Sequence, residues 1–190
     1  MGQRRRLPVV GWQHAAYLKP ANRVLLNLRQ RRSALWIADS ECVAALTRKR
    51  LGVPDDRLAV WPLFAADAGA PRARPWQPGE TIRVGSLGRL HPVKGYDVLI
   101  AALALLRTNG FRPPAPFEVA IAGDGAAHDS LAAMIARAGL DNVRLAGFTG
   151  DARGFLAGLH LYVQPSRSEG LCIALHEAMQ AGLPTIGSAV

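Results

Sequence analysis

Short apolar runs alternate with longer amphipathic segments through residues 81–190. The runs predict strands over residues 81–87, 117–122, 143–145, 159–163 and 185–188. The segments between them predict helices over residues 96–108, 130–138, 151–156 and 173–180. Strands that alternate with helices in this way are typical of a parallel sheet covered on both faces, so the pattern predicts a doubly wound α/β fold. Ligands bind at the carboxyl ends of the strands in such sheets, and we expect the chemistry in the loops that follow these strands.

Residues 1–66 show the same alternation in a shorter form. The pattern predicts strands over residues 7–12, 34–38 and 58–61. It predicts helices over residues 23–32 and 41–50. Ser40 stands at a helix N-cap, where its hydroxyl can accept a hydrogen bond from the first turn. These elements amount to about half of a doubly wound domain.

A proline-rich segment separates the two parts. Residues 67–80 contain three prolines and two glycines and show no apolar period, which is typical of a boundary between domains. We therefore expect a first domain over residues 1–66, a linker over residues 67–80 and a second domain over residues 81–190.

Charge is distributed unevenly between these parts. The 190 residues are 49% hydrophobic and 19% charged, with a net charge of +9, which excludes a disordered chain. Residues 1–78 hold 14 Lys and Arg against 5 Asp and Glu, whereas residues 79–190 hold nine of each. The basic part is interpreted either as a face toward an anionic membrane or as a solvated arginine-rich face. Nucleic acid is disfavoured as a partner, because no recognised motif accompanies the charge and aromatic residues are sparse.

Cysteine content and hydropathy indicate a compartment. Cys42 and Cys172 form no CxxC pattern and are too few for a disulfide scaffold, so a reducing cytoplasm is the simplest location. The longest uncharged apolar run, residues 98–106, is far shorter than the ~20 residues that span a bilayer. We expect a cytoplasmic protein that is soluble or sits on the inner face of the membrane.

The first candidate site follows the strand at 81–87. Residues 88–95, GRLHPVKG, place Arg89 and Lys94 between the end of a strand and the start of a helix. Backbone N–H groups and two cations in such a position suit an anion, and the planar fork of an arginine suits a phosphate. An ordinary loop with two solvated cations is the alternative.

The second candidate follows the strand at 117–122. Gly123-Asp124-Gly125 begins like the dinucleotide-binding fingerprint, but the third glycine is missing. The turn therefore either lets the following helix pack closely or lets the backbone approach a ligand. The missing glycine also disfavours an NAD-dependent oxidoreductase.

The third candidate is the segment PSRSEGLCIALHEAM at residues 165–179. Glu169 ends a loop, residues 170–172 open a helix, and Glu177 lies about two turns further along. A helix N-terminus suits phosphate, and carboxylates in an α/β cleft suit hydroxyl groups. The combination indicates a nucleotide sugar, and a capping Glu169 with a surface Glu177 is the alternative.

Together these segments resemble a known family. The motifs that carry the resemblance are Gly88-Arg89-Leu90, Lys94-Gly95-Tyr96-Asp97, Ala122-Gly123-Asp124-Gly125, Glu169 with Glu177-Ala178-Met179, and Gly182-Leu183-Pro184. Their order and spacing are similar to those of retaining glycosyltransferases of the GT-B fold, in the large family 4 group. The resemblance implies Rossmann-like domains and transfer of a sugar from a nucleoside diphosphate sugar to a glycan or lipid-linked acceptor, in cell-surface polysaccharide synthesis.

The resemblance implies how the donor is held. Arg89 and Lys94 would hold its diphosphate, and Glu177 would take the ribose hydroxyls. The nucleobase would lie near Gly123 and Phe148. The family implies no bound metal and no other cofactor, and the histidines of this chain show no metal-ligand spacing.

The resemblance also implies two residues at the reaction centre, Glu169 and His14. Glu169 would contact the donor sugar together with the backbone of Gly170, Leu171 and Cys172. The segment that ends in His14 is similar to the late strand of the family's first domain, which often ends in a histidine facing the reaction centre. A structural histidine at a strand end is the alternative for His14.

The resemblance is incomplete in extent. The family's first domain normally begins with a strand and a glycine-rich loop, and its second domain continues into a further helix and a tail. Neither pattern is found in this sequence, which we therefore interpret as truncated at both ends. A non-catalytic nucleotide-binding remnant of such an enzyme is the alternative to an active transferase.

Overall fold

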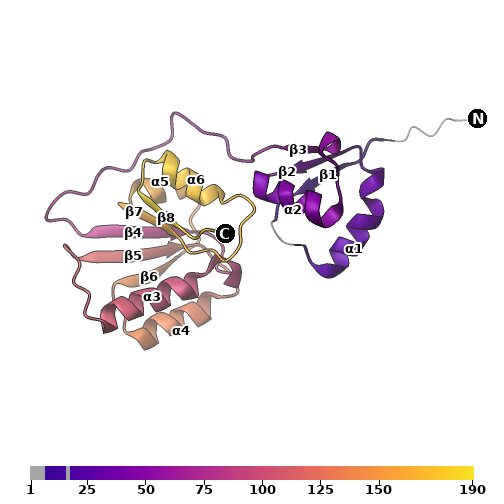
Figure 1. Ribbon diagram of the computed structural model, residues 1–190. Coiled ribbons are helices and arrows are strands. Elements are labelled where there is room, and N and C mark those ends of the chain that lie inside the picture. The colour runs from indigo at the N-terminus through magenta and orange to yellow at the C-terminus, as the bar shows by residue number, and fades with distance from the viewer. Residues whose placement is uncertain (1–6, 16–17) are drawn as a thin grey trace, which may run out of the picture. The chain divides into compact units, whose positions relative to one another are not determined.

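The computed structural model describes residues 7–15 and 18–190, which form two compact units (Figure 1). The first unit comprises the described residues up to Ala65 together with Ser168–Cys172. The second unit comprises Ala66–Arg167 and Ile173–Val190.

The first unit is built on a three-stranded parallel sheet in the order β1-β2-β3. Its strands and helices are β1 (Val10–Gln13), α1 (Pro20–Arg29), β2 (Leu35–Ala38), α2 (Glu41–Leu51) and β3 (Leu58–Val60), with 3-10 turns at Gln30–Arg32 and Asp55–Arg57. The crossover connections β1–α1–β2 and β2–α2–β3 run in the same direction across the sheet. Because such crossovers are right-handed, α1 and α2 lie on the same face.

A small core holds this sheet to its helices. Trp36, Leu51 and Val53 are buried, and Leu26 of α1 packs against them. Gly11 of β1 lies directly against the Trp36 indole, so that a Cβ there would stand 2.7 Å from the ring. The apolar residues of β2 are thus covered, which is the reason that the short central strand is stable.

The caps of α1 and α2 explain where these helices begin and end. Ser40 accepts a hydrogen bond from the Val43 N–H at 3.3 Å, so the predicted N-cap is confirmed, and α2 ends at Gly52 with φ +64°. The helix predicted over residues 23–32 begins earlier, at Pro20, since proline is well suited to the first turn of a helix. Its predicted end is instead the separate 3-10 turn Gln30–Arg32.

The second unit has a five-stranded parallel sheet in the order β6-β5-β4-β7-β8. Its strands are β4 (Ile82–Leu87), β5 (Phe117–Ala122), β6 (Val143–Gly147), β7 (Leu161–Gln164) and β8 (Thr185–Gly187). Its helices are α3 (Tyr96–Thr108), α4 (His128–Ala138), α5 (Ala152–Ala157) and α6 (Ile173–Gln180), with a 3-10 turn, η3, at Pro92–Lys94. The chain runs outward from β4 to β6 and then returns to place β7 on the other side of β4.

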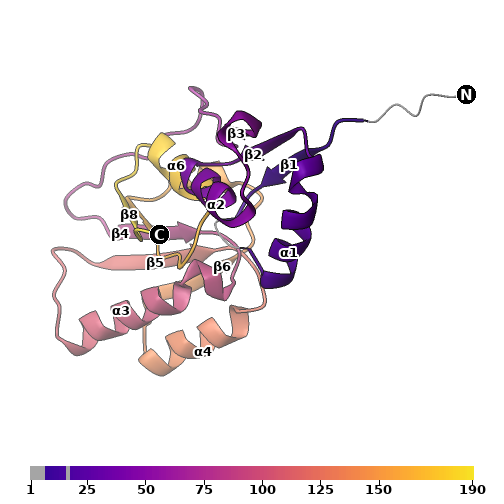
Figure 2. The same cartoon turned by 45° about the vertical axis from the view of Figure 1, so that its right-hand side comes forward.

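This reversal places helices on both faces of the sheet. Figures 1 and 2 show α3 and α4 side by side on one face and α6 on the other. The predicted doubly wound arrangement is therefore confirmed for this unit. In such folds the crevice at the point of reversal, here between β4 and β7, is the usual ligand site.

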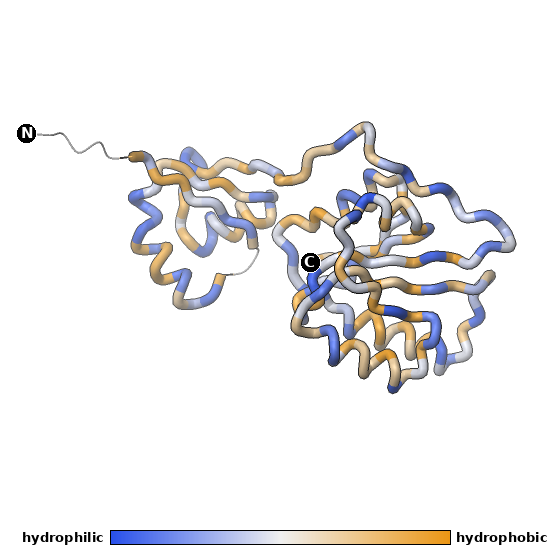
Figure 3. The backbone as a smooth tube through the Cα atoms, turned by 180° about the vertical axis from the view of Figure 1, so that it is seen from behind, coloured by the Kyte–Doolittle hydropathy of each residue, from blue (hydrophilic) through white to orange (hydrophobic). Residues whose placement is uncertain are grey.

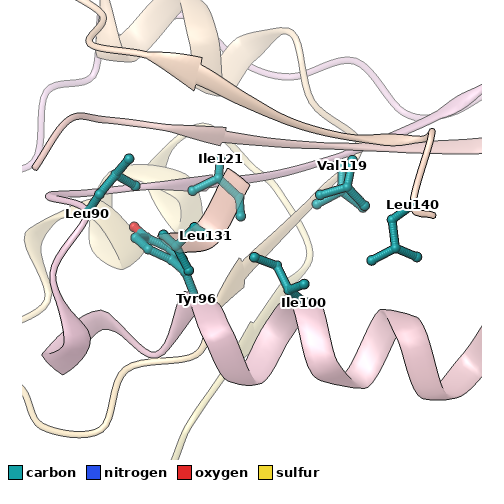
Figure 4. Packing of buried hydrophobic residues seen from close by; sticks show 8 residues of the cluster. Leu90, Tyr96, Ile100, Val119, Ile121, Leu131 and Leu140 are labelled. Carbon is teal, nitrogen blue, oxygen red and sulfur yellow. The ribbon is translucent and has the colours of Figure 1, made fainter. Parts of the chain in front are cut away.

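Two clusters of apolar side chains hold the helices to the sheet. Beneath α3 and α4 lie the buried residues Leu90, Tyr96, Ile100, Val119, Ile121, Leu131, Leu140 and Val143 (Figure 4). The cluster of α5 and α6 contains Leu156, Leu159, Tyr162, Ala178, Ala181 and Leu183. Leu90 belongs to the loop that follows β4, so the first cluster extends under the predicted site.

The bounds of several elements agree with the pattern, and others shift by a few residues. The predicted bounds of α3, β5 and α6 are confirmed, and Gly139 ends α4 with φ +58° as predicted. The strand predicted from residue 159 begins at Leu161, because the Leu159 amide still bonds to the end of α5. The segment at residues 67–80 lies along the second unit, where Ala73 N–H donates to the Ala181 carbonyl at 2.8 Å.

Candidate functional site

The loops that follow β4, β5 and β6 are joined by backbone hydrogen bonds. Gly88 N–H donates to the Ala122 carbonyl at 2.9 Å, and Gly123 N–H donates to the Gly147 carbonyl at 2.7 Å. Leu90 N–H donates to the Asp124 carbonyl at 2.8 Å. The carboxyl ends of three strands thus form one continuous edge.

The glycine at the end of β5 is required by this close packing. Gly123 has φ +143°, and a Cβ on it would overlap the carbonyl oxygen of Gly88. Only glycine adopts this backbone conformation at low cost. The Gly-Asp-Gly turn therefore serves the packing of one loop on another, and Gly123 also lines a hollow at this edge.

A hollow of about 260 Å³ lies at this edge. It is lined by Leu87, Gly88, Arg89, Gly123, Asp124, Phe148 and Thr149. The structure thus brings together three of the predicted donor-binding residues, Arg89, Gly123 and Phe148. Arg89 is exposed and Phe148 is 80% exposed, so a cation and the face of an aromatic ring are open to a ligand here. A guanidinium suits an anionic group and an aromatic face suits a flat ring.

Lys94 lies beside this hollow rather than in its lining. It is the last residue of η3, a turn closed by its own N–H, which donates to the His91 carbonyl at 2.9 Å. Its Cε atom lies 3.6 Å from the position that a Cβ on Gly88 would take. The half-buried chain of Lys94 therefore runs along the glycine that begins the loop.

The loop after β7 is attached to the same turn by Arg167. Its backbone N–H donates to the Val93 carbonyl at 2.8 Å, and its Nη1 donates to the Pro92 carbonyl at 2.7 Å. Its two terminal nitrogens also donate to the two carboxylate oxygens of Asp97. This pairing lowers the pKa of Asp97 and raises that of Arg167. The sequence pattern did not single out Arg167, since the residues it contacts are about seventy positions away.

A buried chain of polar side chains supports the end of β7. Tyr162 donates to Gln164 Oε1 at 2.6 Å, and Gln164 Nε2 donates to Ser166 Oγ at 2.8 Å. The Tyr162 hydroxyl also accepts from Leu87 N–H at 3.3 Å, at the end of β4. Because all three side chains are buried, these bonds fix the two strand ends at the point where the sheet order reverses. Sequence reasoning missed this chain.

Glu177 is placed apart from the hollow. It lies on α6, is half-buried, and lines a separate small recess that also contains Arg153 and Gln180. The structure therefore does not bring Glu177 together with Arg89 and Phe148 in one cavity lining.

The other predicted residues belong to the first unit, where they are grouped together. Ser40 Oγ donates to the Gly170 carbonyl at 2.6 Å. A Cβ on Gly170 would overlap the backbone oxygen of His14, so the glycine allows these two segments to touch. Glu169, Leu171 and Cys172 flank this contact and are half-buried. Residues 170–172 precede α6, which begins at Ile173.

His14 lies against a buried carboxylate that sequence reasoning did not connect with it. Its Nδ1 is 2.9 Å from Asp39 Oδ2, and Trp12 Nε1 donates to Asp39 Oδ1 at 2.7 Å. Gln13 and Ala38 are partners in the β1–β2 register. The residues that follow these parallel strands are therefore neighbours, which is the signal that could have found the pair.

In residues 7–15 and 18–190, no group of three or more His, Cys, Asp and Glu is placed to hold a metal ion. None of the helices in this part of the chain combines the length and apolarity needed to cross a membrane.

Comparison with known proteins identifies relatives of this chain. A family model described as "Glycosyl transferases group 1" matches residues 81–190. The chain is 34% identical over 114 residues to the UDP-N-acetylglucosamine–peptide N-acetylglucosaminyltransferase GtfA subunit of Streptococcus gordonii, covering 60% of this chain and 22% of that protein. It is 32% identical over 118 residues to the amylovoran biosynthesis glycosyltransferase AmsK of Erwinia amylovora, covering 57% of this chain and 28% of that protein.

A solved structure is similar over nearly the whole chain. The structure of Anabaena Alr3699/HepE in complex with UDP and glucose matches with a TM-score of 0.80 and 26% identity, covering 96% of this chain and 53% of that one. The predicted GT-B type of α/β fold is thereby confirmed. The matches span about a quarter of the two curated relatives and about half of HepE.

Proposed function

The chain belongs to the glycosyl transferases group 1 family, and on that premise we propose that it transfers a sugar from a nucleoside diphosphate sugar to a glycan or lipid-linked acceptor. One observation carries the proposal. The loops after β4, β5 and β6 surround a hollow lined by Arg89, Gly123 and Phe148, at the edge where ligands bind in doubly wound sheets.

The exposed groups at this edge support binding of the nucleoside diphosphate. Arg89 supplies a guanidinium for the phosphate oxygens, Phe148 supplies a ring face for the nucleobase, and Lys94 lies beside the loop that begins at Gly88. Glu177 lines a separate recess on α6 and would take the ribose hydroxyls from outside the hollow. The complex of HepE with UDP and glucose supports a donor of this class.

The remaining residues concern the transferred sugar. Glu169 and the backbone of Gly170, Leu171 and Cys172 would contact it, with His14 beside them, and the contact between Gly170 and His14 supports this grouping. The bond from the anomeric carbon to the diphosphate oxygen breaks while the oxygen of an acceptor hydroxyl bonds to that carbon with retention of configuration, and the hydroxyl proton passes to the departing diphosphate. The protein would act mainly by positioning the donor and stabilising the departing diphosphate.

The wider setting of the reaction is also part of the proposal. The relative named for amylovoran biosynthesis supports a role in cell-surface polysaccharide synthesis. We propose that the reaction takes place in the cytoplasm and uses no metal and no other cofactor. Donor binding that is unchanged by a chelator would agree with this, and a requirement for a divalent cation would contradict it.

Calorimetry with UDP and GDP tests the donor site. Arg89→Ala should weaken diphosphate binding by roughly tenfold or more, because a charge-assisted contact to phosphate is lost. Arg112→Ala removes an exposed arginine from the loop before β5 and is the matched control. Equal affinities for wild type and Arg89→Ala would refute the assignment of Arg89.

A non-catalytic nucleotide-binding remnant is the alternative function. It shares the hollow and its ligand, so it predicts the same calorimetric result. Release of UDP from a donor sugar, measured with and without glycan acceptors, separates the two. Turnover supports the transferase, and tight binding without any turnover supports the remnant.

A contact with anionic membrane lipid is proposed for α1. This helix has no buried residue, and Figure 3 shows hydrophobic and hydrophilic positions alternating along it. Leu28 is 74% exposed and Val24 is 62% exposed, next to Arg23 and Arg29. Exposed apolar and cationic side chains on one helix suit an anionic bilayer surface. Flotation with phosphatidylglycerol vesicles should carry the protein, phosphatidylcholine vesicles should not, and Leu28→Gln should weaken the effect.

A further inference from the structure

The histidine that follows β1 rests on a buried carboxylate. His14 Nδ1 lies 2.9 Å from Asp39 Oδ2 and 3.1 Å from Asp39 Oδ1. The side chain of Asp39 is 4% exposed, whereas that of His14 is 58% exposed. One ring nitrogen therefore faces a buried acceptor, while most of the ring is open to solvent.

A second donor holds the same carboxylate. Trp12 Nε1 donates to Asp39 Oδ1 at 2.7 Å, and the Trp12 ring stacks on the imidazole with centroids 5.4 Å apart. Trp12 also stacks with Trp61 at 6.2 Å. A buried carboxylate is costly unless it is hydrogen-bonded, and here two donors satisfy it. These contacts restrain both the plane and the rotation of the imidazole.

This geometry determines which nitrogen of a neutral His14 carries the proton. A carboxylate only accepts hydrogen bonds, so the Nδ1 atom beside it must be the donor. The Nε2 atom is then left with a lone pair and accepts a hydrogen bond. In the other tautomer Nε2 would donate, and the lone pair of Nδ1 would face a lone pair of the Asp39 carboxylate.

We propose that Asp39 is a positioning residue that holds His14 as the Nδ1-protonated tautomer, so that Nε2 accepts a hydrogen bond from a sugar hydroxyl. The sugar part of this inference rests on the proposed function, whereas the tautomer follows from the first unit alone. A sugar hydroxyl is the matching ligand group, because it donates to Nε2 and belongs to both substrates of a glycosyl transfer.

The tautomer is tested by two-bond ¹H–¹⁵N spectra of the full labelled chain in mildly alkaline buffer. His14→Gln identifies the His14 signals among the five histidines. We expect the Nδ1–H tautomer in the wild type and its loss in Asp39→Ala. Asp56→Ala, which removes an exposed carboxylate of the same unit, should leave it unchanged. A wild-type His14 protonated on Nε2 overturns the proposal, and this readout does not depend on whether Asp39→Ala folds.

The sugar is tested in the same spectra with UDP-glucose and GDP-mannose as probes and with UDP and GDP as controls. We expect the His14 Nε2 signal to shift with a nucleotide sugar and not with the matching diphosphate. A nucleotide sugar that binds by calorimetry without moving this signal overturns the sugar assignment. A chain that binds none of the four compounds overturns it together with the proposed function, and the tautomer result then still decides the role of Asp39.

Discussion

The guanidinium group of Arg167 holds the carboxylate of Asp97 in a two-point ion pair, with N–O distances of 2.7 and 2.6 Å. Arg167 follows β7, and Asp97 lies in the first turn of α3. The same guanidinium bonds to the carbonyl of Pro92 in η3. The loop after β7 is thus attached to the turn that carries Lys94.

Replacement of Arg167 should therefore affect both the Asp97 carboxylate and the turn that carries Lys94. In Arg167→Ala the pKa of Asp97 should rise toward its ordinary value, because the hydrogen bonds from Arg167 are the largest cause of its lowering. UDP binding should weaken, but less than in Arg89→Ala, since Arg167 acts through the Lys94 turn. Carboxyl NMR titration and calorimetry measure the two effects.

Arg167→Lys and Arg112→Ala are the informative controls for that prediction. Lysine keeps the charge but cannot offer two parallel donors, so Arg167→Lys should restore little of the binding. Arg112→Ala should change neither quantity, because Arg112 is exposed on another loop. An Asp97 pKa that stays low in Arg167→Ala would show that the ion pair is not its cause.

Gly123→Ala should destabilise the second unit by about 1–3 kcal/mol, since the residue has φ +143° and its new Cβ would overlap the Gly88 carbonyl oxygen. Urea unfolding of the variant measures the loss. Gly150→Ala is the control, because nothing lies within 4 Å of its Cβ position. Equal losses in the two variants would contradict a specific clash at Gly123.

Ser40 has two roles that substitutions can separate. Its hydroxyl accepts from Val43 N–H as the cap of α2 and donates to the Gly170 carbonyl. Ser40→Ala should lower stability by about 1 kcal/mol, whereas Ser40→Asp should keep the cap. A carboxylate cannot donate to Gly170, so both variants should show faster hydrogen–deuterium exchange at residues 168–172. Slow exchange in Ser40→Asp would contradict the second role.

Buried His160 should make stability depend on pH. Its side chain is 2% exposed, and burial, followed by the nearby Arg83 charge, lowers its pKa. The unfolded chain therefore binds a proton at a pH where the folded chain does not. Stability should be full above the ordinary histidine pKa of about 6.5 and should fall as the pH drops below it.

His160→Gln provides the comparison for this pH dependence. The groups that face the ring are Arg83, Glu80 and Arg74, of which Glu80 acts in the opposite direction. The free energy of unfolding, measured with urea at a series of pH values, should change less steeply with pH below neutrality in the variant. Equal slopes of the free energy of unfolding against pH in the wild type and in His160→Gln would show that His160 does not cause the pH dependence.

The succession of strands and helices could be predicted from the sequence, because it depends on local signals. The apolar run of β5 and the periodicity of α3 specify these elements with their bounds, and Gly139 marks the end of α4. The loops at the carboxyl ends of the strands were also predictable as the place of the candidate site. Parallel sheets with crossover helices expose these loops on one edge, whatever their residues are.

The side-chain contacts within each of the two units were decided by the tertiary structure alone. The pairing of His14 with Asp39 depends on the register of β1 with β2, and that of Arg167 with Asp97 depends on the placement of β7 beside β4. The grouping of Gly170 with Ser40 joins residues 130 positions apart. Periodicity and capping act over a few residues, whereas these partners are chosen by packing between distant segments. The sequence by itself therefore determined the elements, the doubly wound type and the sheet edge of the candidate site, and the fold decided which side chains are paired within each unit.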